Sequence, residues 1–149
     1  MFKHILLPTD GSELSNKAAK QAIGFAKGIG AKLTAMNVAG EYHLNLQNEG
    51  FVMPEIPALN KRFEEAEAAR AKKILDAVKK SASEAGVECD VVTATSAVPY
   101  DAIIKQAKKS GCDMIIMASH GRKGFQGLLL GSETVKVLTH SKIPVLVCR

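Results

Sequence analysis

The 149-residue chain has little of the chemistry that marks secreted or metal-binding domains: it has three cysteines and no tryptophan. The cysteines, Cys89, Cys112 and Cys148, are widely spaced and form no C-x-x-C pair. An odd number of isolated cysteines argues against a disulfide framework and against a zinc site. We therefore expect reduced, mostly buried thiols.

Long hydrophobic runs are also missing. The amino-terminal stretch "MFKHILLPTDG" has an apolar run of only a few residues before Pro8 and Asp10. This run is too short for a signal peptide or a membrane span. We expect a cytoplasmic protein with no membrane partner. The histidines show no metal-ligand spacing, and no protein metal site is predicted; they are His4, His43, His120 and His140.

A concentrated basic arm is absent as well. The net charge is +5, but twenty Lys and Arg are scattered among fifteen Asp and Glu, and aromatic residues are not interleaved with them. Scattered doublets such as Lys72-Lys73 are typical of solvated helix faces, so no nucleic-acid partner is expected. With 46% hydrophobic residues, the length suits one core, and we expect a single domain over residues 1–149.

Apolar runs alternate with amphipathic stretches, which is the signature of β-α-β units. The near-continuous apolar runs predict strands covered on both faces, as in a parallel sheet; they are residues 4–9, 32–38, 88–95, 113–118 and 144–148. The helices are expected from Ser12 to Gly28 or Gly30, over 59–85, from Pro99 to Gly111, and from Gly131 or Ser132 onward, with Val135 and Leu138 facing inward. The fold class is therefore α/β: a single doubly wound domain with a five-stranded parallel sheet and about four helices.

One segment, 39–58, breaks the alternation with two prolines, two glycines and no clear period. It is long for a connection. We expect a mobile loop that is either a cover or a partner surface.

Polar residues follow two of the predicted strands. "PTDGS" carries Asp10 after the first, and "SHGRKGFQGLLLGSET" (119–134) follows the fourth. Parallel α/β sheets place ligands at the carboxyl ends of their strands, and a glycine-rich turn before a helix suits phosphate. Neither familiar fingerprint is present, because no Lys precedes Ser132 as in a P-loop and only Gly11 follows the first strand.

These stretches resemble a known family. "ILLPTDGS", "AVPYDAIIKQAKKSGCDMIIMASHGRKG" and "LLLGSETVKVLTHSKIPVLV" are similar to the universal stress protein (UspA-like) family, and the resemblance runs from end to end except across 39–58. It implies an adenine nucleotide alpha hydrolase-like, Rossmann-like fold and dimers that pair their last strands. The nucleotide-binding branch carries a Gly, two residues, a Gly, nine residues, then Gly and Ser or Thr.

On this sequence that pattern falls on Ala118, Gly121, Gly131 and Ser132, so only the first glycine is replaced. The extra methyl of Ala118 lies where backbone and phosphate would approach, although an alanine in an extended conformation is tolerated. For the adenine and ribose end the resemblance implies Pro8, Thr9, Asp10 and Val38. For the phosphate end it implies Ala118, His120, Gly121, Arg122, Gly131, Ser132, Glu133 and Thr134. Glu133 suits a phosphate site only if its side chain points away or helps to hold a divalent ion.

Simpler interpretations stay open. Asp10 could cap the first helix, and Ser132 could be the N-cap of the last. Three functions remain: an ATP-binding regulatory module, with ATP alone or with Mg or Mn and at most slow hydrolysis; an interaction protein of the same fold without nucleotide affinity; and a phosphoryl- or nucleotidyl-transfer enzyme. No catalytic residue is predicted. If the last strand ends the sheet, Val145 to Cys148 would pair with a second copy in a homodimer.

Overall fold

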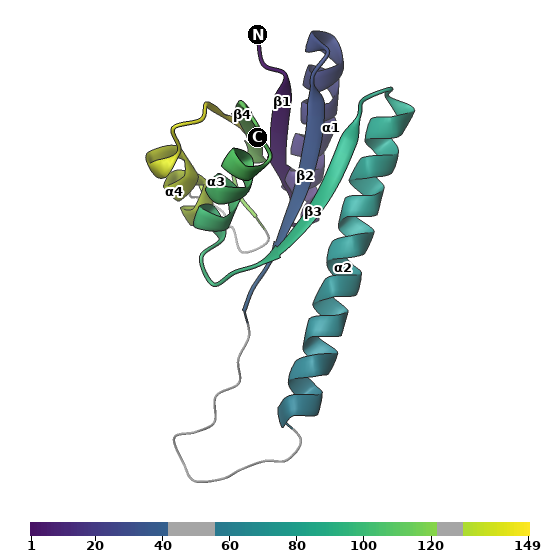
Figure 1. Ribbon diagram of the computed structural model, residues 1–149, viewed down its shortest axis with the longest axis vertical. Helices are drawn as coiled ribbons and strands as arrows, with labels where there is room; N and C mark the ends of the chain where they lie inside the picture. Colours follow the sequence, from purple (N-terminus) through teal and green to yellow (C-terminus); the bar gives the residue numbers. More distant parts are fainter. Residues whose placement is uncertain (42–55, 122–129) are drawn as a thin grey trace.

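The computed structural model describes residues 1–41, 56–121 and 130–149. In these residues five strands alternate with four helices (Figure 1). The strands are β1 (His4–Pro8), β2 (Lys32–Ala39), β3 (Cys89–Thr95), β4 (Met114–Ala118) and β5 (Val145–Cys148). The helices are α1 (Glu13–Ile29), α2 (Ile56–Glu84), α3 (Pro99–Lys109) and α4 (Ser132–His140). The predicted α/β class, strand count and helix count are confirmed.

The strands form one parallel sheet in the order β3-β2-β1-β4-β5. The chain runs outward from β1 to β3 on one side and then returns to place β4 on the other side of β1. Ligand sites of such sheets lie at the carboxyl ends of the strands, next to the point where the order reverses. In this chain that point lies between β1 and β4.

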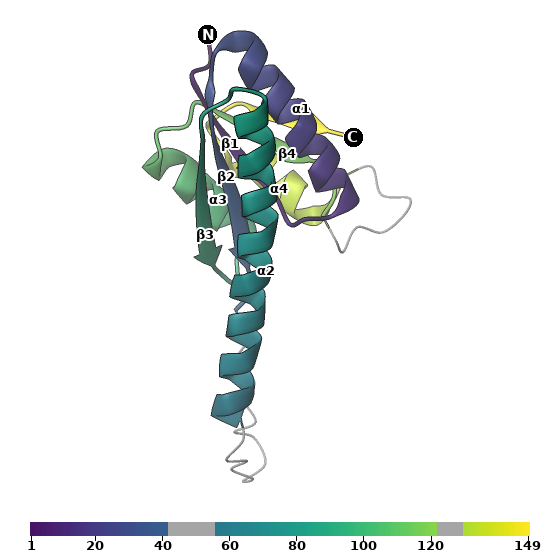
Figure 2. The ribbon, with the colours of Figure 1, turned by 90° about the vertical axis from the view of Figure 1, so that its right-hand side faces the viewer.

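Helices cover both faces of the sheet (Figures 1 and 2). In β1, Ile5 and Leu7 pack into the core cluster with α1 and α2, whereas Leu6 packs into the cluster that includes residues of α3 and α4. All three side chains are fully buried. This two-sided burial explains why the strands read as continuous apolar runs rather than as alternating ones.

The helix boundaries follow local signals. Ser12 is the N-cap of α1, as predicted, and its hydroxyl oxygen accepts a hydrogen bond from the Ser15 N–H at 3.2 Å. Gly30 ends that helix in the left-handed conformation, with φ of 68°. Pro99 opens α3. The predicted loop 39–58 extends too far at both ends, because β2 includes Ala39 and α2 begins at Ile56, with Pro57 in its first turn. Residues 42–55 of the predicted mobile loop lie outside the described residues.

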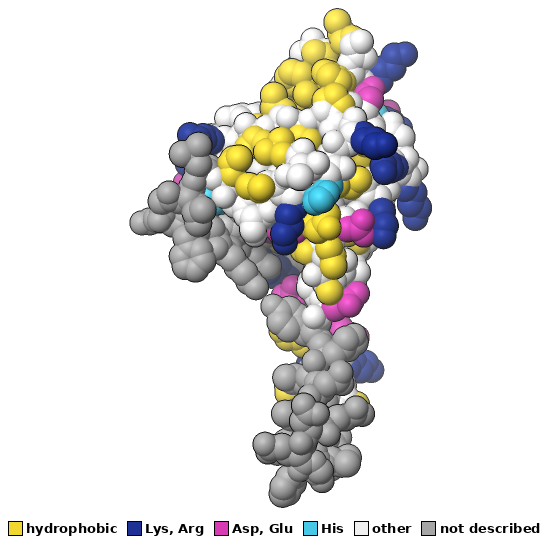
Figure 3. Space-filling model, turned by 90° about the vertical axis from the view of Figure 1, so that its left-hand side faces the viewer, with side chains coloured by type: hydrophobic (Ala, Val, Ile, Leu, Met, Phe, Trp, Pro, Cys, Tyr) yellow, Lys and Arg dark blue, Asp and Glu magenta, His cyan; other side chains and the backbone are white. Residues whose placement is uncertain are grey.

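The prediction that Val135 and Leu138 face inward is wrong, since their side chains are 44% and 40% exposed. The buried residues of α4 are Thr134 and Val137. The apolar residues of α4 gave the wrong register because the inward-facing residue of the first turn is polar. The Thr134 hydroxyl donates to the carbonyl oxygens of Ala118 and Ser119. Figure 3 views the molecule from the side of α3 and α4 and shows small groups of exposed hydrophobic side chains among charged ones.

Candidate functional site

The first part of the site is the turn between β1 and α1. Thr9 is buried; its N–H donates to the Met36 carbonyl at 2.8 Å, and the Asn37 side chain donates to the Thr9 carbonyl at 2.8 Å. Its hydroxyl donates to the Ser15 hydroxyl at 3.2 Å. The polar groups of Thr9 thus join the end of β1 to β2 and α1. These hydrogen bonds hold the backbone in place just before Asp10.

The Asp10 carboxylate closes the turn instead of capping the helix. Its Oδ1 accepts a hydrogen bond from the Ser12 N–H at 3.0 Å, and Ser12 then caps α1. Gly11 between them has φ of 76°, a conformation that side chains rarely adopt. The interpretation of Asp10 as the N-cap of α1 is therefore wrong, because Ser12 holds that position.

The second part is the end of β4 and the start of α4. Ala118 is the last residue of β4, pairs with Cys148 and is 7% exposed. The Gly131 N–H donates to the Ser119 carbonyl at 2.8 Å, and the Thr134 hydroxyl lies 3.1 Å from the Ala118 carbonyl oxygen. These bonds fix the first turn of α4 against the end of β4. The methyl group of Ala118 is accommodated in a regular strand.

The two parts meet at Gly121, and Gly131 packs closely within the second part. A Cβ atom at Gly121 would lie 2.6 Å from Asp10 Oδ2, which is closer than real Cβ atoms come. At Gly131 it would lie 3.3 Å from both His120 Cα and the Ser119 carbonyl oxygen. Neither glycine has a positive φ. Space, not backbone torsion, is therefore what favours glycine at both positions.

Among the described residues, no side chain caps the amino-terminal end of α4. Gly131 is its N-cap, and Ser132 is the first helical residue. The alternative that Ser132 is the N-cap is thus wrong. The first N–H groups of a helix lack partners within the helix and carry partial positive charge. With no side-chain cap, this end of α4 suits an anion.

His120 adds a buried polar atom beside this helix end. Its Nδ1 lies 3.2 Å from the Ser119 hydroxyl, whereas its Nε2 is buried and has no hydrogen-bond partner among the described residues. A buried polar group without a partner is costly, and it calls for an unseen water, ion or ligand. The orphaned nitrogen lies beside the two tight glycines, and together they suit a small polar ligand at this edge of the sheet.

Glu133, predicted at the phosphate end, is engaged by its neighbours. Its Oε2 accepts a hydrogen bond from the Tyr100 N–H at the start of α3 at 2.9 Å, and its Oε1 pairs with Lys136 at 2.8 Å. The Glu133 side chain therefore points toward α3 and Lys136, which meets the condition that it point away from a bound phosphate. Its negative charge is balanced by a lysine and by a helix amino terminus.

The structure brings together most of the predicted site residues. Asp10 meets Gly121, and Ala118, Gly131 and Thr134 are joined by the contacts above. Pro8 ends β1, and Val38 is half-buried near the end of β2, one residue beyond Asn37. Arg122 lies outside the described residues.

Sequence reasoning missed two residues that shape this site, Asn37 and Arg70. Asn37 is a buried amide in a mainly apolar strand, and that interruption is a usable signal. Arg70 reaches from α2 and donates from Nη2 to the Asp10 carbonyl at 3.0 Å. Nothing in the sequence pattern separates it from the other basic residues of α2.

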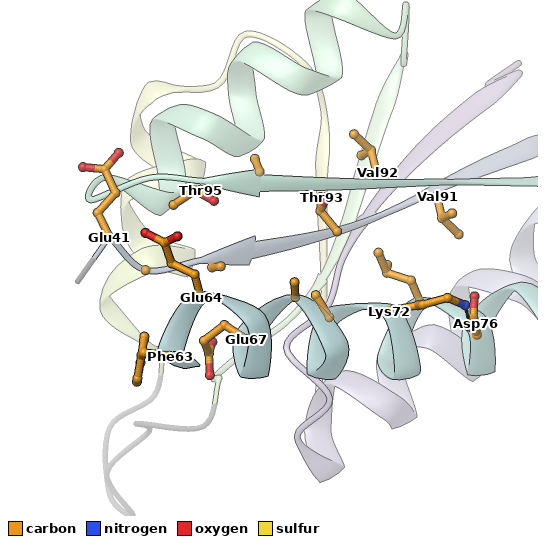
Figure 4. A pocket seen from close by; sticks show the side chains of 16 residues that line it. Glu41, Phe63, Glu64, Glu67, Lys72, Asp76, Val91, Val92, Thr93 and Thr95 are labelled. Carbon is orange, nitrogen blue, oxygen red and sulfur yellow. Dashed lines mark hydrogen bonds and ion pairs between the residues drawn. The ribbon is translucent and has the colours of Figure 1, made fainter. Parts of the chain in front are cut away.

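A cavity of about 550 Å³ lies elsewhere, between α2 and β3 (Figure 4). Ala71, Leu75 and Val91 contribute apolar walls. Its charged lining residues are mainly acidic: Glu41, Glu64, Glu67 and Asp76, with Lys72. A phosphate is disfavoured by such a lining, and no predicted site residue contributes to the described walls. The anion-compatible crevice and this cavity are therefore separate features.

Known proteins share the sequence pattern and the fold of this chain. The sequence model of the universal stress protein family matches residues 1–149. The chain belongs to the universal stress protein family. It is 31% identical over 156 residues to universal stress protein MJ0577 of Methanocaldococcus jannaschii, covering 100% of this chain and 96% of that one. The solved structure of MJ0577 matches with a TM-score of 0.82 at 28% identity, covering 99% and 96% of the two chains.

Two solved universal stress protein structures contain adenine nucleotides. One is a complex with cAMP, with a TM-score of 0.67 at 23% identity and coverage of 99% and 97%. The other, from Archaeoglobus fulgidus, is a complex with dAMP, with a TM-score of 0.64 at 16% identity and coverage of 100% and 98%. At these identities the likeness to this universal stress protein is one of fold.

Two features are absent from the described residues. No helix there combines the length and apolarity needed to cross a membrane. Across residues 1–41, 56–121 and 130–149, no group of three or more His, Cys, Asp or Glu could hold a metal ion.

Proposed function

We propose that this universal stress protein binds an adenine nucleotide, ATP above all, in the crevice between the β1–α1 turn and the β4–α4 turn. The observation that carries the proposal is the contact between Asp10 and Gly121. This contact lies where the strand order reverses, next to the amino-terminal end of α4, which no described side chain caps. A carboxylate suits ribose hydroxyls, and a bare helix end suits phosphates. Relatives of the same fold that contain cAMP and dAMP support the choice of an adenine nucleotide.

The residues divide between the two ends of the ligand. Asp10 would accept hydrogen bonds from the ribose, with Pro8, Thr9 and Val38 beside the sugar and base. The backbone around Gly121 and Gly131, and the first N–H groups of α4 from Ser132 on, would bind phosphate. His120 Nε2, buried and unpartnered, would gain a partner from the ligand. Arg122, outside the described residues, would add positive charge, and a Mg or Mn ion would be carried by the phosphates of ATP.

The chemistry of this set is that of binding rather than turnover. The Thr134 hydroxyl is committed to two carbonyls, and the Glu133 carboxylate is committed to Tyr100 and Lys136. Neither is therefore poised as a nucleophile or as a base. We propose a cytoplasmic stress-response regulatory module in which the nucleotide state tunes partner binding or oligomer state, with at most slow hydrolysis.

The alternative of a nucleotide-free interaction protein depended on Ala118. Because Ala118 lies in a regular strand and has no positive φ, its methyl group imposes no backbone strain. The alternative therefore rests on the space that this methyl group takes beside a bound phosphate, and not on backbone conformation. The experiment that separates the two functions is a titration of ligand-stripped protein with ATP and magnesium, preceded by mass spectrometry of denatured protein to detect any nucleotide retained on purification.

We also propose a homodimer through β5, the last strand of the sheet. Ile115 donates to the Pro144 carbonyl and Ser119 to the Cys148 carbonyl, so the backbone groups of Val145 and Val147 face the open edge by the alternation of a parallel ladder. Unpaired edge groups invite a symmetry-related strand. Leu146, 38% exposed, adds apolar surface to that edge.

A further inference from the structure

Arg70 of α2 is held between its own helix and the β1–α1 turn. Its Nη2 donates to the Asp10 carbonyl at 3.0 Å, and its Nη1 lies 3.8 Å from Glu67 Oε1. Its side chain is 33% exposed. A guanidinium presents several donors in a rigid fork, so it can join two groups in a fixed geometry, which an ammonium does less well.

The same face of α2 also contacts the next residue of the turn. A Cβ atom at Gly11 would lie 2.8 Å from the Cδ1 of Ile74. Ile74 is four residues after Arg70, and side chains at this spacing lie on one face of a helix. Two successive residues, Asp10 and Gly11, thus rest against adjacent side chains of α2.

This contact bears on the Asp10 carboxylate. The carboxylate and the carbonyl held by Arg70 belong to one residue, and Oδ1 is further fixed by the Ser12 N–H at 3.0 Å. The other oxygen, Oδ2, is the atom that approaches Gly121. A shift of the Asp10 backbone away from α2 would therefore move the carboxylate relative to Gly121.

We infer that Arg70 is a positioning residue of the nucleotide site: from α2 it holds the Asp10 turn and so fixes the carboxylate at the ribose end. This inference rests on the proposed function. Since Arg70 acts through the turn and not on the phosphates, its loss lowers affinity for adenosine and for ATP by the same factor. A direct phosphate contact would lower affinity for ATP alone.

The test is an Arg70→Met variant, which keeps an unbranched side chain on α2 and removes the donor fork. Lys73→Met is the matched control, because it removes the same charge from an exposed position on the same helix. Titrations with adenosine and with ATP and magnesium are expected to show affinities about tenfold weaker for Arg70→Met with both ligands. Lys73→Met is expected to stay within about twofold of the wild type. Equal affinities in the two variants, or a loss confined to ATP, would overturn the inference.

A second measurement needs no ligand. Hydrogen exchange of the Ser12 amide, which donates to Asp10 Oδ1, reports whether the turn is held, and it is expected to be faster in Arg70→Met by about tenfold and unchanged in Lys73→Met. Unchanged exchange in Arg70→Met would overturn the inference even if nucleotide binds. Wild-type protein that binds neither adenosine nor ATP would instead overturn the proposed function, and with it any role of Arg70 in nucleotide affinity.

Discussion

The Asp10 carboxylate and the Gly121 backbone are so close that a single Cβ atom on Gly121 would lie 2.6 Å from Asp10 Oδ2. Asp10 follows β1 and Gly121 follows β4, and these strands are neighbours in the sheet. The sheet order thus brings together two turns that are 111 residues apart in the chain.

The Gly121→Ala variant tests this approach. The added methyl group would push the Asp10 carboxylate away from Gly121 and against its hydrogen bond from the Ser12 N–H, so folding is expected to lose about 1 kcal/mol. ATP affinity is expected to fall by about tenfold or more, or at least about 1.4 kcal/mol of binding free energy. Isothermal titration and thermal unfolding measure the two quantities.

The control for this substitution is Gly24→Ala in α1, where a Cβ atom would meet nothing within 4 Å. It should bind ATP like the wild type and gain a little stability from the better helix former. If Gly121→Ala kept wild-type ATP affinity, the approach of Gly121 to Asp10 would have no role in binding.

His4 makes stability depend on pH. It is 8% exposed and its Nε2 lies 2.8 Å from the Thr34 hydroxyl. Burial, with the nearby charge of Lys32, lowers the pKa of His4 below its usual 6.5. The unfolded chain therefore takes up a proton more readily than the folded one, and stability falls as the pH drops from 6.5 through the lower folded pKa.

We expect the free energy of unfolding, measured with urea, to decline between pH 7 and pH 5 in the wild type and to decline less in His4→Gln. The exposed His140 provides the control variant, His140→Gln. Asp113 does not titrate between pH 7 and pH 5. Burial alone would raise the pKa of its carboxyl group, but hydrogen bonds from the Lys3 and His4 N–H groups lower that pKa below the usual 3.8. Identical slopes in wild type and His4→Gln would refute the assignment.

The three thiols are expected to be inert in the folded protein. All are free and buried, and burial raises the pKa of each, that of Cys112 to about 11. Because the thiolate is the reactive form, reaction with a disulfide reagent at pH 8 should be slow before unfolding and should reach three equivalents in denaturant. One thiol reacting at the rate of a free cysteine in native protein would contradict the burial of that side chain.

The β5 edge is tested by Val147→Pro, which removes an N–H group that faces the open edge and places a ring there. The wild type is expected to be a dimer by light scattering and the variant a monomer. Circular dichroism shows whether the variant stays folded. A Leu146→Ser variant, which keeps every backbone group, should weaken the dimer less. A folded variant that dimerises like the wild type would exclude pairing through this edge.

The fold was predictable because the apolar runs and helix signals agree along the chain. Strands buried on both faces leave long apolar runs, and Ser12 and Pro99 mark helix starts. Where one helix is short, as in α4, the pattern failed: Thr134 takes the inward position through hydrogen bonds to carbonyls, and a hydroxyl gives no apolar signal. The register of a nine-residue helix is fixed by such bonds as much as by apolar side chains.

The candidate site was predictable in part. The end of the first strand indicates Asp10, and the resemblance to the universal stress protein family implies Gly121 and Gly131. Their closeness depends on the strand order, which a sequence restricts without fixing. The role of Arg70 could not be predicted. The sequence does not distinguish an arginine that donates to a carbonyl 60 residues away from an arginine whose side chain is solvated.

The most direct test of the account is the affinity of ligand-stripped wild-type protein for ATP with magnesium. Saturable binding is expected with a dissociation constant below about 1 mM, where binding contributes more than about 4 kcal/mol, and binding is expected to be weaker in Gly121→Ala. The absence of binding up to that concentration would contradict this expectation.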